Sequence, residues 1–214
     1  MSERLQIGIL LSGKGRGSNM QALIDGTRDG RIRGDVALVI STSPGAPALE
    51  RAAASGVPAL LVPAEEHPEP GALDRELAER FLAAGVELIC LAGYMRLLGP
   101  EFLGRFPNRV LNVHPALLPA FGGRGYYGRR VHEAVLESGA RYTGVTVHLT
   151  DDEYDHGPIV AQEVVPVLRD DTVETLAARV LQAEHRLYPE AVALFAARRV
   201  QVEGRRVLIA PPQE

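Results

Sequence analysis

The sequence has few of the residue types that mark a disulfide-rich, metal-rich or aromatic-cored protein. Its 214 residues include no tryptophan and a single cysteine, Cys90. One cysteine excludes an intramolecular disulfide and a cysteine-rich metal site. Aromatic residues make up only 5% of the chain, so a core has to be built from Val, Leu, Ile and Ala.

Charge and hydropathy exclude two further classes of partner. The formal net charge of −4 argues against a surface for non-specific nucleic-acid binding. No apolar run approaches the roughly 20 residues that span a bilayer, and the N-terminus lacks the pattern of a signal peptide. We therefore expect a cytoplasmic protein with no nucleic-acid or membrane partner. A small anion remains a candidate ligand, because aligned backbone N–H groups bind one without net positive charge.

Short apolar runs alternate with amphipathic segments along the chain. Strands are predicted at 7–11, 36–41, 58–62, 86–91, 110–114, 142–150 and 159–167, and helices at 20–27, 46–55, 73–84 and 130–138. A long last helix is expected to open with Asp171 and Glu174 as a capping pair, and residues 201–209 are expected to pair as an edge strand. This alternation predicts one α/β domain with a mostly parallel twisted sheet and helices on both faces.

A glycine-rich loop, Ser12-Gly-Lys-Gly-Arg-Gly-Ser-Asn19, separates the first strand from the first helix. The dinucleotide fingerprint requires a glycine where Ser18 stands, and the Walker loop requires a Gly-Lys-Ser/Thr triplet, so both are excluded. The first N–H groups of a helix lack partners, which suits this loop to a phosphate. Ser18 and Asn19 would add donors. A flexible turn without a ligand is the alternative.

Asn112 and His114 lie two residues apart in the strand predicted at 110–114. Side chains alternate between the faces of a strand, so these two project the same way, about 7 Å apart. They stand at the carboxyl end of the strand, where α/β folds bind ligands. The pattern favours a functional pair over a histidine buried for packing.

Two acidic residues in the second half are also candidates for function. Asp155 ends a run of acids and directly precedes His156-Gly-Pro and the next strand. Glu184 falls on the apolar stripe of the last helix, where a carboxylate is costly unless something satisfies it. Either an internal salt bridge or an amine-bearing ligand is expected at Glu184.

These segments together resemble the folate-dependent formyltransferases, in the branch that acts on glycinamide ribonucleotide. The resemblance covers nearly the whole chain in order: the loop 12–19, Leu91-Ala-Gly-Tyr-Met-Arg96, Leu111-Asn-Val-His-Pro-Ala-Leu-Leu-Pro119, the segment 144–158, and Glu184-His185. The Asn-x-His-Pro-x-Leu-Leu-Pro run with a later Asp-x-Gly-Pro is specific to this family. It implies a single Rossmann-like formyltransferase domain over residues 1–214.

The resemblance also implies an activity and a set of site residues. The formyl group of 10-formyltetrahydrofolate, a co-substrate, would pass to the amine of 5-phosphoribosylglycinamide in purine (IMP) biosynthesis, with no metal. Asn112, His114 and Asp155 would be catalytic. Substrate contacts would come from Gly17, Ser18, Asn19 and Glu184, and a folate pocket from Met95, Arg96, Leu97, Leu98, Asp151, Asp152, Glu153 and Tyr154. Residues 1–105 would contain the phosphate loop, and residues 106–214 would contain the catalytic and folate-binding residues. If the chain assembles, a homodimer is expected.

The residue types suit that chemistry. Attack of the amine on the formyl carbon develops negative charge on the carbonyl oxygen, and donors aimed at this oxygen lower the barrier. The Asn112 amide and a protonated His114 are the expected donors. Asp155 is expected to raise the pKa of His114 and to help move the proton off the attacking amine.

Three departures from the family pattern concern the substrate side. The glycine loop is two residues longer than Ser-Gly-x-Gly-Ser-Asn, Ala116 stands where serine is frequent, and residues 121–128 replace a Pro-Gly and histidine-bearing stretch. Arg124, in the replaced stretch, is a candidate phosphate contact.

Other functions remain as alternatives. One is a formyltetrahydrofolate deformylase-like hydrolase, and another is a non-catalytic folate- or nucleotide-binding module. Because the formyltransferase segments fill this chain and its net charge is negative, we expect neither a deformylase nor a methionyl-tRNA formyltransferase, and the missing dinucleotide fingerprint disfavours an oxidoreductase.

Overall fold

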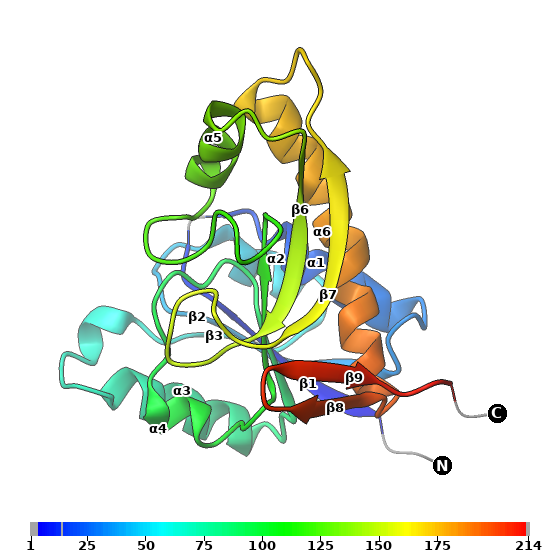
Figure 1. The fold of residues 1–214 in the computed structure, drawn as a ribbon. Coiled ribbons are helices and arrows are strands. Elements are labelled where there is room, and N and C mark those ends of the chain that lie inside the picture. The colour runs from blue at the N-terminus through cyan, green and yellow to red at the C-terminus, as the bar shows by residue number, and fades with distance from the viewer. Residues whose placement is uncertain (1–3, 14, 213–214) are drawn as a thin grey trace.

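One seven-stranded sheet forms the centre of the protein in the computed structural model, which describes residues 4–13 and 15–212 (Figure 1). The strands are β1 (Leu5–Leu11), β2 (Gly34–Ser41), β3 (Ala59–Leu61), β4 (Leu88–Leu91), β5 (Val110–His114), β6 (Tyr142–Leu149) and β7 (Ile159–Pro166). Their order is β3-β2-β1-β4-β5-β6-β7. The pairs from β3 to β5 are parallel, whereas β6 runs antiparallel to both β5 and β7. The predicted mostly parallel sheet is confirmed.

Helices cover both faces of this sheet. The helices are α1 (Ser18–Arg28), α2 (Pro47–Ala54), α3 (Ala72–Ala83), α4 (Pro100–Leu103), α5 (Arg129–Glu137) and α6 (Val173–Ala196), with a 3₁₀ turn at Ala64–Glu66. Buried residues of α1, α2, α5 and α6 belong to one hydrophobic cluster and those of α3 and α4 to a second. The sheet separates the two clusters, as the predicted α/β architecture requires.

The alternation of side chains along β1 shows how the sequence produces the two layers. Ile7 and Ile9 belong to the first cluster and Leu10 to the second, and all three are fully buried. Gly8 faces α3, where an added Cβ would lie 2.6 Å from the Phe81 ring. A glycine at this position therefore lets α3 pack closely on the sheet.

The C-terminal segment differs from the expected edge strand. It forms β8 (Val200–Glu203) and β9 (Arg206–Ile209), an antiparallel hairpin that is separate from the main sheet. Gly204 reverses the chain with a φ of 58°, in the left-handed region that glycine adopts at little cost. The two strands thus pair with each other rather than with an edge of the sheet.

The start of α6 also differs from the prediction. Thr172 is the N-cap, and its side chain accepts from the backbone N–H of Thr175 while the Thr175 hydroxyl accepts from the N–H of Thr172. Asp171 lies one residue too early to cap. Its carboxylate instead accepts two bonds of 2.7 Å from the Arg179 guanidinium. Both arrangements tie the first turns of the helix to the chain before it.

Candidate active site

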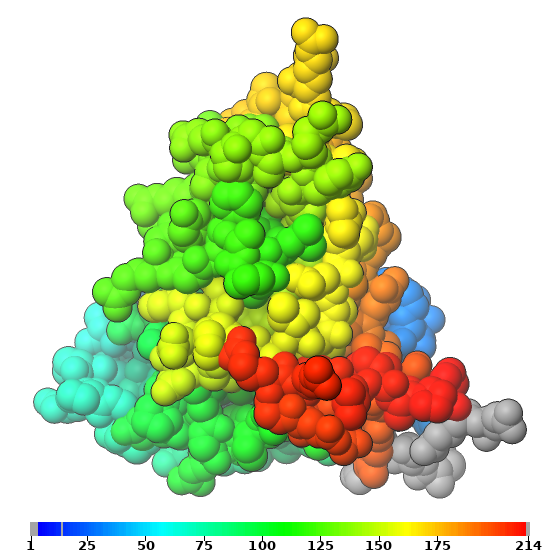
Figure 2. Space-filling model, in the orientation of Figure 1, coloured from blue at the N-terminus to red at the C-terminus, as the bar shows by residue number. Residues whose placement is uncertain are grey.

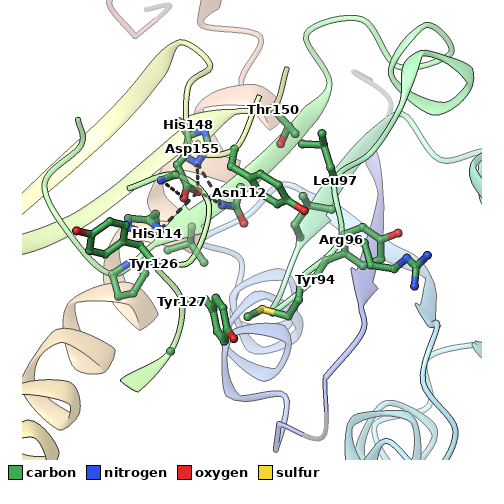
Figure 3. A pocket seen from close by; sticks show the side chains of 18 of the residues that line it. Tyr94, Arg96, Leu97, Asn112, His114, Tyr126, Tyr127, His148, Thr150 and Asp155 are labelled. Carbon is green, nitrogen blue, oxygen red and sulfur yellow. Dashed lines mark hydrogen bonds and ion pairs between the residues drawn. The ribbon is translucent and has the colours of Figure 1, made fainter. Parts of the chain in front are cut away.

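A cavity of about 410 Å³ opens where β4 and β5 end, the place predicted for a ligand (Figure 3). Its lining comes from the segments after these two strands, from 123–128, and from the end of β6 with the loop that follows. Asn19 of α1, His132 of α5 and Glu184 of α6 complete it. Segments from both halves of the sequence therefore meet at one site.

The three predicted catalytic side chains converge in this cavity. His114 Nδ1 lies 3.5 Å from Asp155 Oδ1, and Asn112 Nδ2 lies 3.4 Å from the same oxygen. The His114 side chain is 4% exposed and that of Asp155 is 11% exposed. Figure 3 shows them directed toward one another from β5 and from the loop after β6.

His148 is a fourth member of this group, which sequence reasoning did not single out. In the β5–β6 ladder it stands directly opposite Asn112. Its Nδ1 donates to the Leu149 carbonyl at 2.8 Å, so its Nε2 is free to accept from Asn112 Nδ2 at 3.1 Å. His148 thereby fixes which way the Asn112 amide points. The register of the β5–β6 pair brings these residues together, and the sequence of either strand alone does not determine that register.

Asp155 is held in an uncommon backbone conformation, with a φ of 55°. Its Oδ2 accepts from the backbone N–H of Gly123 at 2.9 Å. Burial acts to raise the pKa of Asp155, but the neighbouring His148 and His114 rings and the Gly123 N–H outweigh it, so the pKa lies below its ordinary value. The carboxylate is therefore ionised at neutral pH.

The pKa of His114 corrects one expectation. Burial lowers this pKa more than the Asp155 carboxylate and the bond to the Phe121 carbonyl raise it, so it lies below its ordinary value. Asp155 thus raises this pKa as expected, but burial outweighs it, so the ligand-free ring is not the protonated donor expected from the sequence. His114 Nε2 lies 2.8 Å from the Phe121 carbonyl oxygen, which only accepts, so Nε2 carries the proton. The neutral ring then presents an unprotonated Nδ1 to Asp155.

Glu184 and Asn19 join α6 to α1 beside this group. Asn19 Nδ2 donates to Glu184 Oε2 at 2.6 Å. Within residues 4–13 and 15–212, Glu184 forms no ion pair, so the internal salt bridge is not found there. Burial raises the pKa of Glu184 to about 7, with Asn19 opposing the increase. An amine-bearing ligand remains the prediction for this carboxylate.

The raised pKa of Glu184 predicts a specific pH dependence of stability. The native state holds a proton that the unfolded state releases near pH 4.5. The free energy of unfolding should therefore fall as pH rises through the window from 4.5 to about 7, by about 3 kcal/mol. Glu184→Gln removes this loss because a neutral amide replaces the titrating group.

Thermal unfolding of the ligand-free protein at pH 5 and pH 8 tests this expectation. Glu184→Gln should be more stable than the wild type at pH 8, by roughly 5–10 °C in Tm, with a smaller difference at pH 5. Glu190→Gln, an exposed position on the same helix, should follow the wild type at both values. Equal pH dependence in wild type and Glu184→Gln would contradict the expectation.

The predicted folate residues divide into two groups. Met95, Arg96, Leu97, Leu98, Glu153 and Tyr154 line the cavity. Asp151 and Asp152 do not line it, and Asp151 instead contacts His156, with Oδ2 2.8 Å from Nδ1. Tyr126, Tyr127, His132 and Thr150 line the cavity and were not predicted.

Backbone contacts hold the 93–99 segment at the cavity edge. The N–H of Met95 donates to Ser12 Oγ at 2.8 Å, and the N–H of Gly99 donates to Asp74 Oδ2 at 2.5 Å. Met95 and Leu97 remain 44% and 40% exposed. Two apolar side chains left open beside a cavity are suited to the flat face of an aromatic ligand.

The glycine loop leads directly into α1. Gly17 has a φ of 69°, and an added Cβ would lie 2.8 Å from the Ala48 Cβ, so only glycine fits. The helix begins at Ser18, and the N–H groups of its first turn lack intrahelical partners. Asn19 lies on the main cavity, whereas Gly13, Gly15 and Gly17 line an adjoining hollow of about 240 Å³. Lys14 lies outside the described residues.

Comparisons with known proteins show the family to which the chain belongs. The formyl transferase family matches residues 6–192. The chloroplastic phosphoribosylglycinamide formyltransferase of Arabidopsis thaliana is 44% identical over 199 residues, which cover 92% of this chain and 68% of that protein. The trifunctional purine biosynthetic protein adenosine-3 of Drosophila melanogaster is 42% identical over 194 residues, or 90% of this chain and 14% of that longer protein.

A solved structure is similar over almost the full length. The crystal structure of glycinamide ribonucleotide transformylase 1 from Symbiobacterium toebii has a TM-score of 0.92 and 49% sequence identity, covering 99% of this chain and 96% of that one. The chain belongs to the formyl transferase family. Within it, the chain groups with the phosphoribosylglycinamide formyltransferases of purine biosynthesis, which confirms the enzyme class and function predicted from the sequence.

Proposed function

We propose that the chain transfers the formyl group of 10-formyltetrahydrofolate to the amine of 5-phosphoribosylglycinamide by direct attack, assisted by Asn112, His114 and Asp155. The observation that supports these roles is the convergence of the three side chains, with His148, in one cavity at the ends of β4 and β5. The Asn112 amide donor and the His114 Nδ1 proton acceptor lie 3.4 Å and 3.5 Å from the same oxygen, Asp155 Oδ1.

Asn112 stabilises the developing oxyanion in this proposal. One of its Nδ2 hydrogens is directed to His148, and the other makes a long contact of 3.4 Å with Asp155. That second donor is therefore available to the formyl oxygen as negative charge builds on it. A single donor of this kind typically contributes about 10²–10³-fold to turnover.

His114 and Asp155 handle the proton. As the C–N bond to the substrate amine forms, Nδ1 of the neutral His114 takes the proton that the nitrogen loses. The Asp155 carboxylate, 3.5 Å away, stabilises the imidazolium. The proton then passes to the folate nitrogen as its bond to the formyl carbon breaks. His114 thus acts first as a base and then as an acid.

The remaining walls place the two substrates. The N-terminus of α1 with Gly17, Ser18 and Asn19 binds the phosphate, and Glu184 accepts from the glycinamide amine. Met95 to Leu98 with Glu153 and Tyr154 contact the folate. Arg124 lines the cavity and remains a candidate phosphate contact.

The proposal is tested by mixing purified protein with 10-formyltetrahydrofolate, with and without the ribonucleotide. Loss of the folate formyl group that requires the ribonucleotide, together with formation of its formylated product, is the expected result. Equal loss without the ribonucleotide would mean hydrolysis, and no loss in either mixture would mean a different acceptor or a binding role; either would overturn the proposal.

Location and assembly remain predictions. In the described part of the chain, no helix is long and apolar enough to cross a membrane, and no group of three or more His, Cys, Asp or Glu side chains is placed to hold a metal ion. The Arabidopsis relative is named chloroplastic. We propose a cytoplasmic location and a homodimer for this chain, to be tested by fractionation and by light scattering.

A further inference from the structure

The β8–β9 hairpin touches the loop that carries Asp155. This Asp155 loop, residues 150–158, joins β6 to β7, and its yellow surface lies directly against the red hairpin (Figure 2). Arg205, at the hairpin turn, donates from Nη2 to the His156 carbonyl at 2.6 Å and places Nη1 2.8 Å from His156 Nε2. One guanidinium therefore contacts both the backbone and the ring of the residue that follows Asp155.

The His156 ring lies between the Asp151 carboxylate and the Arg205 guanidinium, and its contacts show which ring nitrogen carries the proton. Asp151 Oδ2 lies 2.8 Å from His156 Nδ1 and only accepts, so Nδ1 carries the proton. Arg205 Nη1 lies 2.8 Å from His156 Nε2 and 3.3 Å from Nδ1, so this end of the guanidinium lies over the imidazole ring. Arg205 is thereby fixed at two points of its planar fork, and the chain Arg205–His156–Asp151 spans the Asp155 loop from one end to the other.

The Asp155 loop needs support from outside. A non-glycine residue with a φ of 55° persists only where its surroundings over-determine it. The Gly123 N–H holds the Asp155 carboxylate from the cavity side. The hydrogen bond from Arg205, which does not line the cavity, holds the His156–Gly157 peptide. Loss of this bond removes one of the contacts that hold the backbone after Asp155.

We propose that Arg205 is a positioning residue for formyl transfer: it fixes the Asp155 loop so that the Asp155 carboxylate faces His114. This inference rests on the proposed function for its kinetic consequence, but the contact itself does not. It assigns a role to the C-terminal hairpin, which contributes no residue to the lining of the main cavity. Because Arg205 and His156 are both exposed, the contact should affect the loop more than global stability.

Three variants test the proposal. Arg205→Ala should lower kcat about ten- to a hundredfold, since a small misplacement of a reacting group has effects of that size, and should raise KM for the folate, whose pocket includes Glu153 and Tyr154. KM for the ribonucleotide and Tm should stay near wild type. Arg205→Lys keeps one donor for the carbonyl and should recover part of the loss. Arg206→Ala, the exposed neighbour, should behave as the wild type.

The pH profile separates positioning from a general structural role. The Asp155 carboxylate raises the pKa of His114, so an Asp155 loop that has loosened should lower that pKa. The ascending limb of kcat against pH should then move to lower pH in Arg205→Ala, and not in Arg206→Ala. An unchanged kcat with an unchanged limb would overturn the proposal.

A measurement that needs no turnover tests the role of Arg205 independently of the proposed function. Amide hydrogen exchange of residues 150–158 should be about tenfold faster in Arg205→Ala than in the wild type, with the rest of the sheet unchanged. Faster exchange supports the positioning role of Arg205 even if the ribonucleotide proves not to be the acceptor. Unchanged exchange in the Asp155 loop would overturn the proposal even if the wild type transfers the formyl group as expected.

Discussion

Asp155→Asn is expected to lower turnover about a thousandfold, within the range of removing a positioned acid–base group, while the protein folds normally. The change removes the negative charge 3.5 Å from His114 Nδ1, which in the proposed mechanism stabilises the imidazolium. The pKa of His114, already lowered by burial, then falls further. Nδ1 becomes too weak a base to take the proton from the attacking amine.

The fold should tolerate this change for local reasons. Asparagine is among the few residues that adopt a positive φ readily, so the φ of 55° remains accessible. The amide has the size of the carboxylate, and its oxygen still accepts from the Gly123 N–H. Substrate binding should therefore change little, and the effect should appear in kcat.

Steady-state kinetics and thermal unfolding of two variants test this expectation. Asp170→Asn makes the same change of charge in the exposed turn before α6 and should keep wild-type turnover. Asp155→Asn should lose turnover at a Tm close to wild type. A folded Asp155→Asn protein with wild-type kcat would remove Asp155 from the mechanism.

The layered fold is predictable because its signals are local. The two-residue alternation of Ile7, Ile9 and Leu10 is a property of one strand, and it places each side chain in the correct cluster. The same alternation placed Asn112 and His114 on one face of β5 before any pairing was known. Features that depend on one segment are thus readable from the sequence.

Features that depend on two distant segments are not readable in the same way. His148 joins the site only because the β5–β6 register sets it opposite Asn112, and the sequence does not state that register. The direction of the His114 pKa depends on how deeply the ring is buried, which the packing of several elements decides. The hairpin at 200–209 likewise depends on a choice between two pairing partners.

Asp151 shows how a residue type alone misleads. The family resemblance assigns Asp155 to catalysis and the acids at 151–153 to the folate pocket, yet the loop turns between them. Asp155 reaches the cavity, whereas Asp151 reaches His156 on the outer side. Charge in the sequence identified the segment, and only the path of the backbone assigned the individual side chains.

Gly157→Ala is expected to disrupt both the Asp155 loop and the sheet beside it. An added Cβ would overlap the Leu149 carbonyl oxygen and lie 2.8 Å from the Leu149 carbonyl carbon and 3.4 Å from the Asp151 nitrogen. All three atoms are backbone, so no side-chain rotation relieves the overlap. The chain has to move away from the end of β6, and the 2.8 Å hydrogen bond from the Leu149 N–H to the Pro158 carbonyl is the first to break.

This displacement carries Asp155 with it, because only His156 separates the two residues. We therefore expect Gly157→Ala to lose most turnover and about 2–3 kcal/mol of unfolding free energy, as overpacking of a rigid site commonly does. Kinetics and denaturant unfolding measure the two losses. Gly15→Ala, where an added Cβ meets nothing within 4 Å, is the matched control for stability. If Gly157→Ala retained wild-type stability and turnover, the Asp155 loop would not need its close approach to β6, and the rigid placement of Asp155 would have to come from Gly123 and Arg205 alone.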